Sequence, residues 1–307
     1  MIGRALLFAV LLCAGGPQAR AELPASVLES VVSLLPTWPA GSLPPGADPE
    51  GSGVVIFPGG WVVTALHVVA PATAVTVRLA DGRRLPATVV GRDAPTDIAL
   101  LRIAADPPPL PRGPRPGLAA PVCAIGNAFG LDLSVTCGVV SALDRSGTGF
   151  NRVEDFLQTD ASVNPGMSGG ALVDAQGRLV GMLSAIFTKQ SDADIGVNFA
   201  VSLPLLLRVA EDLREVGRVR RGEAGLRVER AEDGGVRVGW VAGDGPAAAA
   251  GLRRGDRLLA IAGRPLRSPD DVTAALYLQR PNVPFALRFV RGETIEEGVM
   301  TLVEKRP

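Results

Sequence analysis

The hydrophobic residues of this chain gather in short runs that are separated by glycine, proline and polar turn residues. In the first third of the chain these runs are rich in β-branched side chains and lie at residues 53–57, 60–64, 74–79 and 98–103. Short, closely spaced runs favour a β-barrel or β-sandwich over alternating strands and helices. The pattern therefore predicts a mainly β domain near the start of the chain.

A proline-rich stretch then interrupts the pattern. Residues 106–116 contain six prolines, and because proline cannot donate to a strand ladder, we interpret this stretch as a linker near residues 106–118. Strand-like runs resume beyond it, at residues 122–126, 134–143, 171–173, 179–185 and 196–202. We expect a second barrel here, so that two barrels share residues 51–217.

A helix and a further domain are predicted after the barrels. Residues 204–216 have helical spacing with Pro204 in the first turn, and the basic stretch 218–222 follows as a hinge. Strands are then expected at residues 226–229, 236–241, 257–261 and 285–290, and helices at residues 247–250 and 270–279. Residues 222–307 are therefore expected to form a small α+β domain.

The composition supports folded domains and gives no sign of a nucleic-acid partner. The chain has 307 residues, of which 47% are hydrophobic, and 31 basic side chains balance 31 acidic ones. A balanced chain lacks the basic footprint that nucleic-acid binding requires.

The first 21 residues are typical of a secretory signal. Arg4 precedes an apolar run, and the small-residue pattern Ala19-Arg20-Ala21 follows it. We expect a signal peptide over residues 1–21, cleavage after Ala21, and a lead-in over residues 22–50. Of the remaining cysteines, Cys123 and Cys137 flank a turn-rich stretch. A disulfide across a hairpin and two buried free thiols are both compatible with that spacing.

The single histidine of the chain, His67, limits the possible chemistry. It removes the usual His-rich zinc site, and no metal or cofactor is expected. By default a lone histidine in an apolar run is a structural residue. A catalytic role therefore needs partners elsewhere in the sequence.

A glycine-rich turn around Ser168 and an aspartate at Asp97 supply those partners. Glycines beside a serine let the backbone bend sharply, expose the hydroxyl and aim N–H groups at an oxyanion. The same Gly-x-Ser-x-Gly pattern fits an α/β-hydrolase, but that fold needs a histidine after the serine, and none follows Ser168. The order His67, Asp97, Ser168 is that of chymotrypsin. The subtilisin order would need an aspartate before His67, where only Asp48 stands, in the lead-in.

A series of short motifs between residues 50 and 205 strengthens this interpretation. They are GSGV at 51–54, TALHVV at 64–69, TDIALL at 96–101, AIGNAFG at 124–130, QTDA at 158–161, GMSGG at 166–170 and NFAV at 198–201. Together they resemble the HtrA/Deg family of trypsin-like serine proteases, and residues 245–263 are similar to a PDZ domain. The resemblance implies a chymotrypsin-like double β-barrel followed by one small PDZ-like domain.

The resemblance also implies roles for the site residues. Ser168 would be the nucleophile, His67 the general base and Asp97 the residue that orients the imidazole, with the backbone N–H groups of Gly166 and Ser168 as the oxyanion hole. Ser162 would lie at the base of the S1 pocket, and because it is uncharged, apolar side chains are expected there rather than Arg or Lys. The substrate backbone would pair with Asn198, Phe199, Ala200 and Val201.

Two residues depart from the family pattern. Met167 stands where an asparagine is usual, and Leu66 precedes the histidine where a small residue is usual. Neither removes a catalytic atom. Both are expected to affect how readily the oxyanion loop reaches its active shape.

The PDZ-like segment is expected to bind an extended peptide as an added strand. The residues expected in this groove are Gly225, Leu226, Arg227, Val228, Val272 and Leu276. Arg227 has two interpretations, a carboxylate ligand or a solvated strand residue.

The resemblance implies a periplasmic serine endopeptidase that cleaves unfolded or misfolded proteins in protein quality control. Its partners would be unfolded or C-terminally exposed polypeptides, and a trimer is expected on the same grounds. One alternative is a regulatory protease that is switched on when its PDZ domain binds a peptide. Another is a non-catalytic peptide-binding or chaperone protein.

Overall fold

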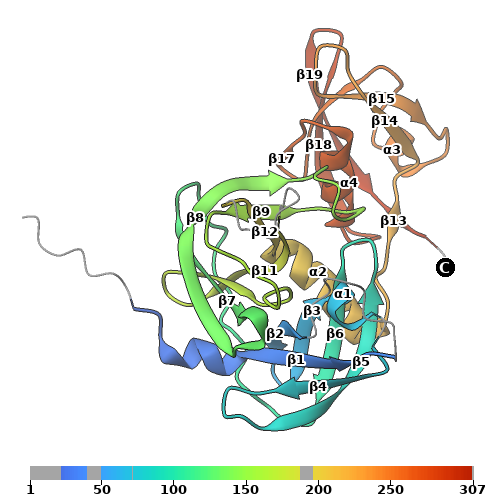
Figure 1. Cartoon of the computed structure of the whole chain (residues 1–307). Coiled ribbons are helices and arrows are strands. Elements are labelled where there is room, and N and C mark those ends of the chain that lie inside the picture. Colours follow the sequence, from blue (N-terminus) through green and yellow to red (C-terminus); the bar gives the residue numbers. More distant parts are fainter. Residues whose placement is uncertain (1–21, 40–49, 71, 187–195, 306–307) are drawn as a thin grey trace, which may run out of the picture.

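The computed structural model of the chain describes residues 22–39, 50–70, 72–186 and 196–305 (Figure 1). The expected signal peptide and its cleavage after Ala21 lie outside these residues. Within the described ranges, no helix combines the length and the apolar character that crossing a membrane requires.

The first barrel closes in the order β1-β2-β3-β6-β5-β4. Its strands are β1 (Val31–Thr37), β2 (Gly51–Phe57), β3 (Trp61–Ala65), β4 (Ala74–Arg78), β5 (Arg84–Asp93) and β6 (Ile98–Ile103). β1 pairs with both β2 and β4 and thereby closes the barrel. The barrel therefore begins inside the segment that the sequence suggested as a lead-in, after the short helix η1 (Ala25–Ser30).

The second barrel closes in the order β10-β11-β12-β9-β8-β7. Its strands are β7 (Pro121–Asn127), β8 (Leu133–Arg145), β9 (Phe156–Thr159), β10 (Ala171–Asp174), β11 (Leu179–Ile186) and β12 (Asn198–Ser202). Cys123 and Cys137 lie opposite each other on β7 and β8 and form a disulfide. Of the two alternatives for these cysteines, the structure shows the bonded one.

The two barrels share one apolar core. Buried side chains of both barrels, among them Val54 and Leu100 from the first and Ile125 and Met182 from the second, belong to a single cluster. Helix α2 (Leu203–Val216) packs on strands of both barrels. The Ser202 side chain accepts the Leu205 N–H at its start, and Gly217 ends it with a φ of 73°. The double-barrel prediction is confirmed.

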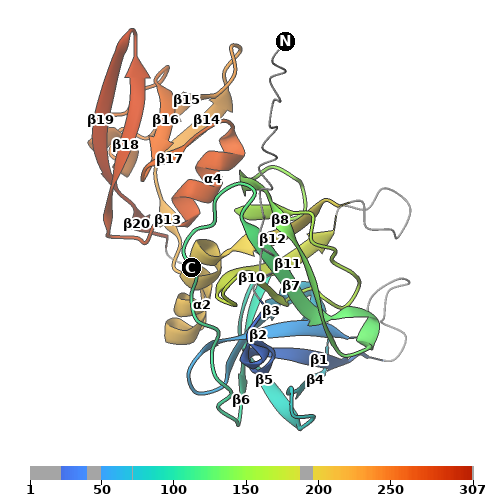
Figure 2. The same ribbon diagram turned by 90° about the vertical axis from the view of Figure 1, so that its left-hand side faces the viewer.

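The C-terminal domain is built on a separate sheet with its own core. Its strands are β14 (Leu226–Arg230), β15 (Val236–Val241), β16 (Arg257–Ile261), β17 (Arg264–Pro265), β18 (Pro284–Arg291) and β19 (Thr294–Thr301), while β13 (Gly222–Glu223) pairs with β20 (Val303–Glu304). The main strand order is β14-β15-β16-β18-β19. Helices α3 (Pro246–Ala249) and α4 (Pro269–Tyr277) complete the domain, and Figure 2 shows α4 on the side that faces the barrels.

Polar contacts join this domain to the barrels. Arg264 binds Asp155 at 2.5 Å and Asp144 at 2.9 Å, although Asp155 is almost wholly buried. Ser146 donates to Asp271 at 2.6 Å. Arg280 reaches Asp212 at 2.8 Å. Tyr277 and Leu278 of the C-terminal domain also pack, partly buried, against the core of the barrels. The junction therefore combines several ion pairs with a small apolar contact.

Candidate active site

Asp97 and His67 form a closely bonded pair at the edge of the first barrel. β3 pairs with β6 so that Ala65 lies opposite Ile98, and the helix α1 (Leu66–Val69) begins immediately after β3. One carboxylate oxygen of Asp97 lies 2.6 Å from His67 Nδ1, and the other accepts the backbone N–H of His67 at 2.9 Å. Asp97 has a φ of 57°, a left-handed conformation that aspartate tolerates better than most residues.

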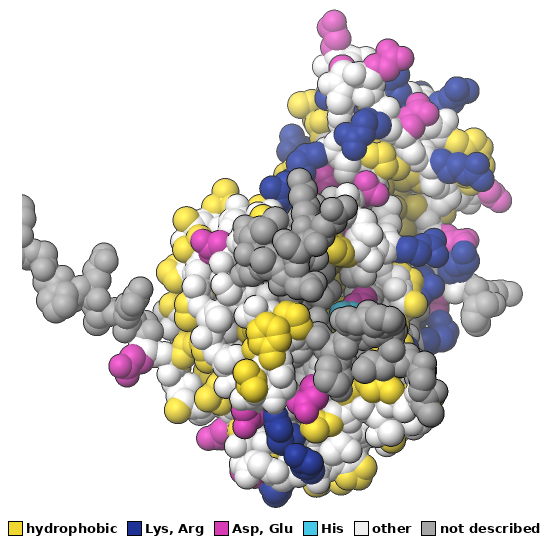
Figure 3. Space-filling model, in the orientation of Figure 1, with side chains coloured by type: hydrophobic (Ala, Val, Ile, Leu, Met, Phe, Trp, Pro, Cys, Tyr) yellow, Lys and Arg dark blue, Asp and Glu magenta, His cyan; other side chains and the backbone are white. Residues whose placement is uncertain are grey.

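This contact assigns the proton on the imidazole. An ionised carboxylate can only accept hydrogen bonds, so Nδ1 of His67 carries the proton and Nε2 remains an acceptor. The His67 side chain is 52% exposed and the Asp97 side chain 17%. In Figure 3 the histidine appears in cyan at the surface. Nε2 is therefore available as a base.

Ser168 lies in the turn between β9 and β10, against the first barrel. Its carbonyl accepts the backbone N–H of Ser52 from β2 at 2.9 Å. The next residue, Gly169, has a φ of 85°, and a Cβ there would lie 2.2 Å from the Ser52 carbonyl oxygen. Only glycine fits this approach, which explains the glycine after the serine. Within the described part of the chain no hydrogen bond joins the Ser168 hydroxyl to His67, a contact that enzymes commonly tighten only when substrate binds.

The peptide groups before Ser168 are oriented by neighbouring N–H donors. The Pro165 carbonyl accepts from the Phe129 N–H at 2.8 Å, and the Met167 carbonyl accepts from the Gly170 N–H at 2.9 Å. In a trans peptide the N–H points away from the C=O of the same unit. The N–H groups of Gly166 and Ser168 therefore point away from Phe129 and Gly170 respectively.

Two further observations concern the departures from the family pattern. Met167 is completely buried in the core of the second barrel, and its sulfur accepts the Asn164 N–H at 3.4 Å. Leu66 packs, partly buried, on the core of the first barrel. Both side chains therefore serve barrel packing beside the site.

The structure corrects one expectation about substrate binding. Asn198, Phe199, Ala200 and Val201 lie on β12, which pairs with β11 along one edge and with β9 along the other. Because both edges are occupied, this strand cannot add a substrate backbone. Asn198 instead donates its side-chain N–H to the Ala161 carbonyl at 2.9 Å. That bond ties β12 to the residue before Ser162, which is exposed.

β11 provides the strand edge nearest to Ser168. Leu183 donates to the Gly170 carbonyl and accepts from the Gly169 N–H, both at 2.8 Å. Beyond Leu183, residues 184–186 pair with β12 on one side only among the described strands. Sequence reasoning missed this edge because only the pairing of the strands shows which side of β11 or β12 lacks a partner.

The groove expected in the C-terminal domain has the parts of a strand-addition site. β14 lies at the sheet edge, and its only strand partner in the described chain is β15. Gly225, just before β14, has a φ of 65°. The expected apolar residues of β14 and α4 pack on the core of the domain; they are Leu226, Val228, Val272 and Leu276. Arg227 lies over the Trp240 ring at 5.4 Å, which favours its interpretation as a surface strand residue.

Tyr277 and Asp93 connect α4 to the triad and were not found from the sequence. The Tyr277 hydroxyl donates to Asp93 at 2.6 Å. Burial and the nearby Asp93 carboxylate raise the pKa of Tyr277 well above its usual value, so the phenol stays protonated. Asp93 also accepts from the Thr96 hydroxyl at 2.6 Å, and Asp97 follows Thr96. The only hint in the sequence is that Tyr277 is the sole tyrosine.

No group of acidic, histidine or cysteine side chains suited to a metal ion occurs among the described residues. The arrangement suits acyl transfer, since it combines an imidazole oriented by a carboxylate with a serine loop bonded to the same barrel. These features, on two closed barrels, define a trypsin-like peptidase domain that carries a PDZ domain.

Comparison with known proteins agrees with that class. Residues 51–182 match the trypsin-like peptidase domain family, and residues 231–291 match the PDZ domain family. The chain is 34% identical to an HtrA-type protease, AlgW, solved with a tripeptide, with a TM-score of 0.72 over 92% of this chain and 97% of that one. The chain belongs to the HtrA/Deg family.

Curated relatives of the chain are longer proteins. A probable periplasmic serine endoprotease DegP-like of Pseudomonas fulva is 37% identical over 83% of this chain and 57% of that protein. The periplasmic serine endoprotease DegP of Escherichia coli is 38% identical over 79% of this chain and 53% of that protein. The chain thus spans about half the length of these relatives.

Proposed function

We propose that this protein is a serine endopeptidase. The observation that carries the proposal is the His67–Asp97 pair on the first barrel, to which strand β2 bonds the serine loop. Ser168 Oγ attacks the substrate carbonyl while His67 Nε2 takes its proton. His67 then returns the proton to the leaving amine, and Asp97 stabilises the imidazolium. Water, deprotonated by His67, hydrolyses the acyl-enzyme and releases Ser168.

The edge of β11 that has no partner among the described strands is the better candidate for holding the substrate backbone. Residues 184–186 continue directly from Leu183, which is bonded to the serine loop, so a strand added there would run past Ser168. Ser162 gives the adjoining pocket no charge, and we therefore expect cleavage after apolar residues. Cleavage confined to Arg or Lys would contradict this part of the proposal.

We propose unfolded or misfolded proteins of the cell envelope as substrates. A strand-addition site accepts any extended backbone, and unfolded chains expose both backbone and apolar side chains. Relatives named periplasmic serine endoproteases support the compartment. Trimeric assembly stays a prediction.

The direct test is hydrolysis of casein, an unfolded substrate, by residues 22–307 beside the variant Ser168→Ala. We expect the parent to produce a broad set of fragments and the variant to produce none. Cleavage by both proteins would assign the activity to another residue or to a contaminant. Cleavage by neither protein, with peptide binding retained, would favour the non-catalytic alternative.

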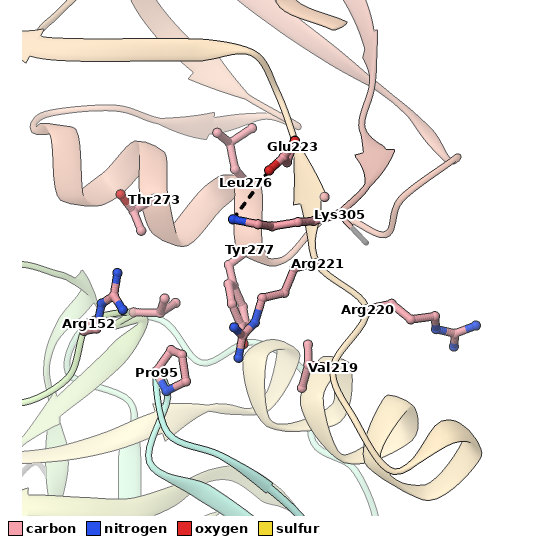
Figure 4. A pocket seen from close by; sticks show the side chains of 12 residues that line it. Pro95, Arg152, Val219, Arg220, Arg221, Glu223, Thr273, Leu276, Tyr277 and Lys305 are labelled. Atoms are coloured by element: carbon pink, nitrogen blue, oxygen red, sulfur yellow. Dashed lines mark ion pairs between the residues drawn. The ribbon is translucent and has the colours of Figure 1, made fainter. Parts of the chain in front are cut away.

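A second candidate, a protease regulated by its PDZ domain, is favoured by the Tyr277–Asp93 contact. Tyr277 ends α4, the helix that also carries Val272 and Leu276 of the groove. Figure 4 shows Tyr277 extending from α4 towards Pro95 and Arg221, in a cleft of about 460 Å³ between the domains. A peptide that shifts α4 would therefore move a contact of the turn that carries Asp97.

Peptides with an apolar C-terminal residue would test this candidate. If it is right, such peptides change the rate of a small fluorogenic substrate in the parent, and Tyr277→Phe reduces that change. Substrate turnover that is independent of added peptide in both proteins would leave unregulated quality control as the function.

A further inference from the structure

Ser52 occupies an unusual position between the first barrel and the serine loop. It lies on β2, is completely buried, and its backbone N–H donates to the Ser168 carbonyl at 2.9 Å. Its carbonyl accepts the Thr64 hydroxyl at 2.7 Å. Ser52 is therefore fixed on the first barrel while contacting the loop that carries the nucleophile.

The hydroxyl of Ser52 bridges two backbone groups of the second barrel. It accepts the Asn127 N–H at 2.8 Å and donates to the Gly166 carbonyl at 2.8 Å. Because an N–H group can only donate, the single hydroxyl hydrogen of Ser52 must point to Gly166. The direction of this bond follows from its two partners.

The acceptor belongs to the peptide unit that separates the two oxyanion donors. The Gly166–Met167 unit is held at one end by Ser52, through its carbonyl, and at the other by its N–H, which donates to the Asn164 carbonyl at 3.0 Å. With both ends bonded, the plane of this unit is fixed. The neighbouring peptide units, which carry the N–H groups of Gly166 and Ser168, are joined to this unit and are held by the Phe129 and Gly170 N–H groups.

The space around the Ser52 hydroxyl is tight, and it depends on two neighbouring glycines. A Cβ at Gly126 would lie 2.8 Å from Ser52 Oγ, and a Cβ at Gly166 would lie 2.3 Å from the Asn127 carbonyl oxygen. Both distances are shorter than real Cβ contacts. The two glycines thus allow the loop and β7 to approach the hydroxyl closely enough for both bonds.

We propose that Ser52 is a positioning residue for the oxyanion hole, which it holds in its active orientation from the other barrel. The role rests on the proposed peptidase activity, because it acts through the Gly166 and Ser168 N–H groups and does not touch substrate. Removing the hydroxyl deprives the Asn127 N–H and the Gly166 carbonyl of their shared partner, and the loop gains freedom to turn its donors away.

The test measures kcat, KM and the melting temperature for a fluorogenic peptide with the parent, Ser52→Ala and Thr64→Val. Thr64→Val is the matched control, since it removes a buried hydrogen bond to the same serine but none to the 166–167 peptide. We expect Ser52→Ala to lower kcat by at least about tenfold with KM within about threefold, because oxyanion donors act in the transition state. Thr64→Val should retain kcat within about twofold at a similar loss of melting temperature.

A folded Ser52→Ala enzyme with the parent's kcat would overturn the proposal. So would an equal kcat loss in Thr64→Val, since the effect would then follow stability alone. If Ser52→Ala does not fold, Gly126→Ala takes its place under the same criteria, because its Cβ would lie 2.8 Å from Ser52 Oγ and displace the hydroxyl. A parent without turnover and without reaction of Ser168 with a fluorophosphonate would instead remove the peptidase function, and this role with it.

Discussion

The contact between the two barrels differs in kind from the contact between the barrels and the PDZ domain. Between the barrels, side chains such as Val54, Leu100, Ile125 and Met182 form one apolar cluster, and the catalytic groups lie along its edge. Between the barrels and the PDZ domain, the bonds instead run from arginines and Tyr277 to buried carboxylates. Apolar packing responds little to salt, whereas charge pairs at partly exposed positions weaken with it.

Because of this difference, we expect the contact between the barrels to be rigid and the contact with the PDZ domain to be adjustable. A buried carboxylate loses its partner when the PDZ domain moves, but water can then solvate it. An apolar cluster has no such substitute. We therefore expect the PDZ domain to move more readily against the barrels than the barrels move against each other.

The largest expected effect is a loss of activity that leaves both contacts between domains intact. Ser168→Ala removes the nucleophile but no contact between domains, so we expect a loss of hydrolysis of at least about 10⁴-fold with an unchanged melting temperature. Rates on a fluorogenic peptide and thermal unfolding measure the two quantities. Ser141→Ala, at an exposed serine of β8, is the control and should keep most of the activity. A Ser168→Ala enzyme with more than a few per cent of parent activity would contradict the triad.

The next effect breaks the charged junction alone. Arg264→Ala leaves Asp155 buried without this partner, at an expected cost of about 3–5 kcal/mol while the domains stay docked. We expect the PDZ domain to detach, while a fluorogenic peptide that does not need the groove is still hydrolysed. Small-angle scattering and limited proteolysis within residues 217–222 would report the detachment. An unchanged scattering profile would show that apolar contacts hold this junction after all.

A smaller effect is expected from crowding the apolar junction. Gly169→Ala places a Cβ 2.2 Å from the Ser52 carbonyl oxygen at a φ of 85°, so we expect a loss of about 2–3 kcal/mol in unfolding free energy together with activity. Gly217→Ala is the matched control, because its φ is 73° but no atom lies within 4 Å. Denaturant unfolding should show a cost of only about 1 kcal/mol there. Equal costs at both positions would mean that the close approach does not matter.

Acid should affect the charged junction before the apolar one. Burial disfavours ionisation of Asp212, but hydrogen bonds from Arg220 and Arg208 lower its pKa below the ordinary 3.8. Burial likewise opposes ionisation of Asp271, yet bonds from Arg267 and Ser146 lower its pKa. A carboxylate whose pKa is lowered in the folded state stabilises that state at pH values above its ordinary pKa. This stabilisation is lost as the pH falls below the ordinary pKa and through the lowered one. Scattering should therefore show constant docking from pH 8 to 5 and opening below about pH 3.8. Opening already between pH 7 and 5 would contradict these assignments.

The smallest effect is expected from an exposed ion pair, which shows how little such a pair contributes to the free energy of unfolding. Arg257 and Asp233 form an ion pair on the PDZ surface, where both side chains are well exposed. We expect Arg257→Ala to change the unfolding free energy by less than about 0.5 kcal/mol and to leave docking intact. A large change in denaturant unfolding would show that exposure is a poor guide to the value of these pairs.

Much of the fold could be predicted because its strands are short, apolar and punctuated by turn residues. β1 was not predicted because it contains Pro36 and follows no obvious turn signal. β5 was not predicted because exposed and half-buried residues alternate along most of it. Both strands are defined by their partners in the closed barrel. A sequence pattern does not reveal those partners.

The triad could be predicted because the types of its three residues and their order along the chain are enough to identify them. The supporting residues could not. Ser52, Asp93 and Tyr277 act through contacts between segments far apart in the sequence, and each is an ordinary residue type in its local context. The substrate edge was assigned to β12 instead of β11 for a related reason, because only pairing shows which strand has a free edge.

The central claim is that His67, Asp97 and Ser168 form one working site at the rigid barrel junction. Treatment with a fluorophosphonate, followed by mass spectrometry of the digested protein, tests it most directly. We expect a single label on Ser168, formed at least about 100-fold more slowly in His67→Ala and at the parent's rate in Arg264→Ala. Labelling elsewhere, or labelling of Ser168 that does not depend on His67, would contradict it.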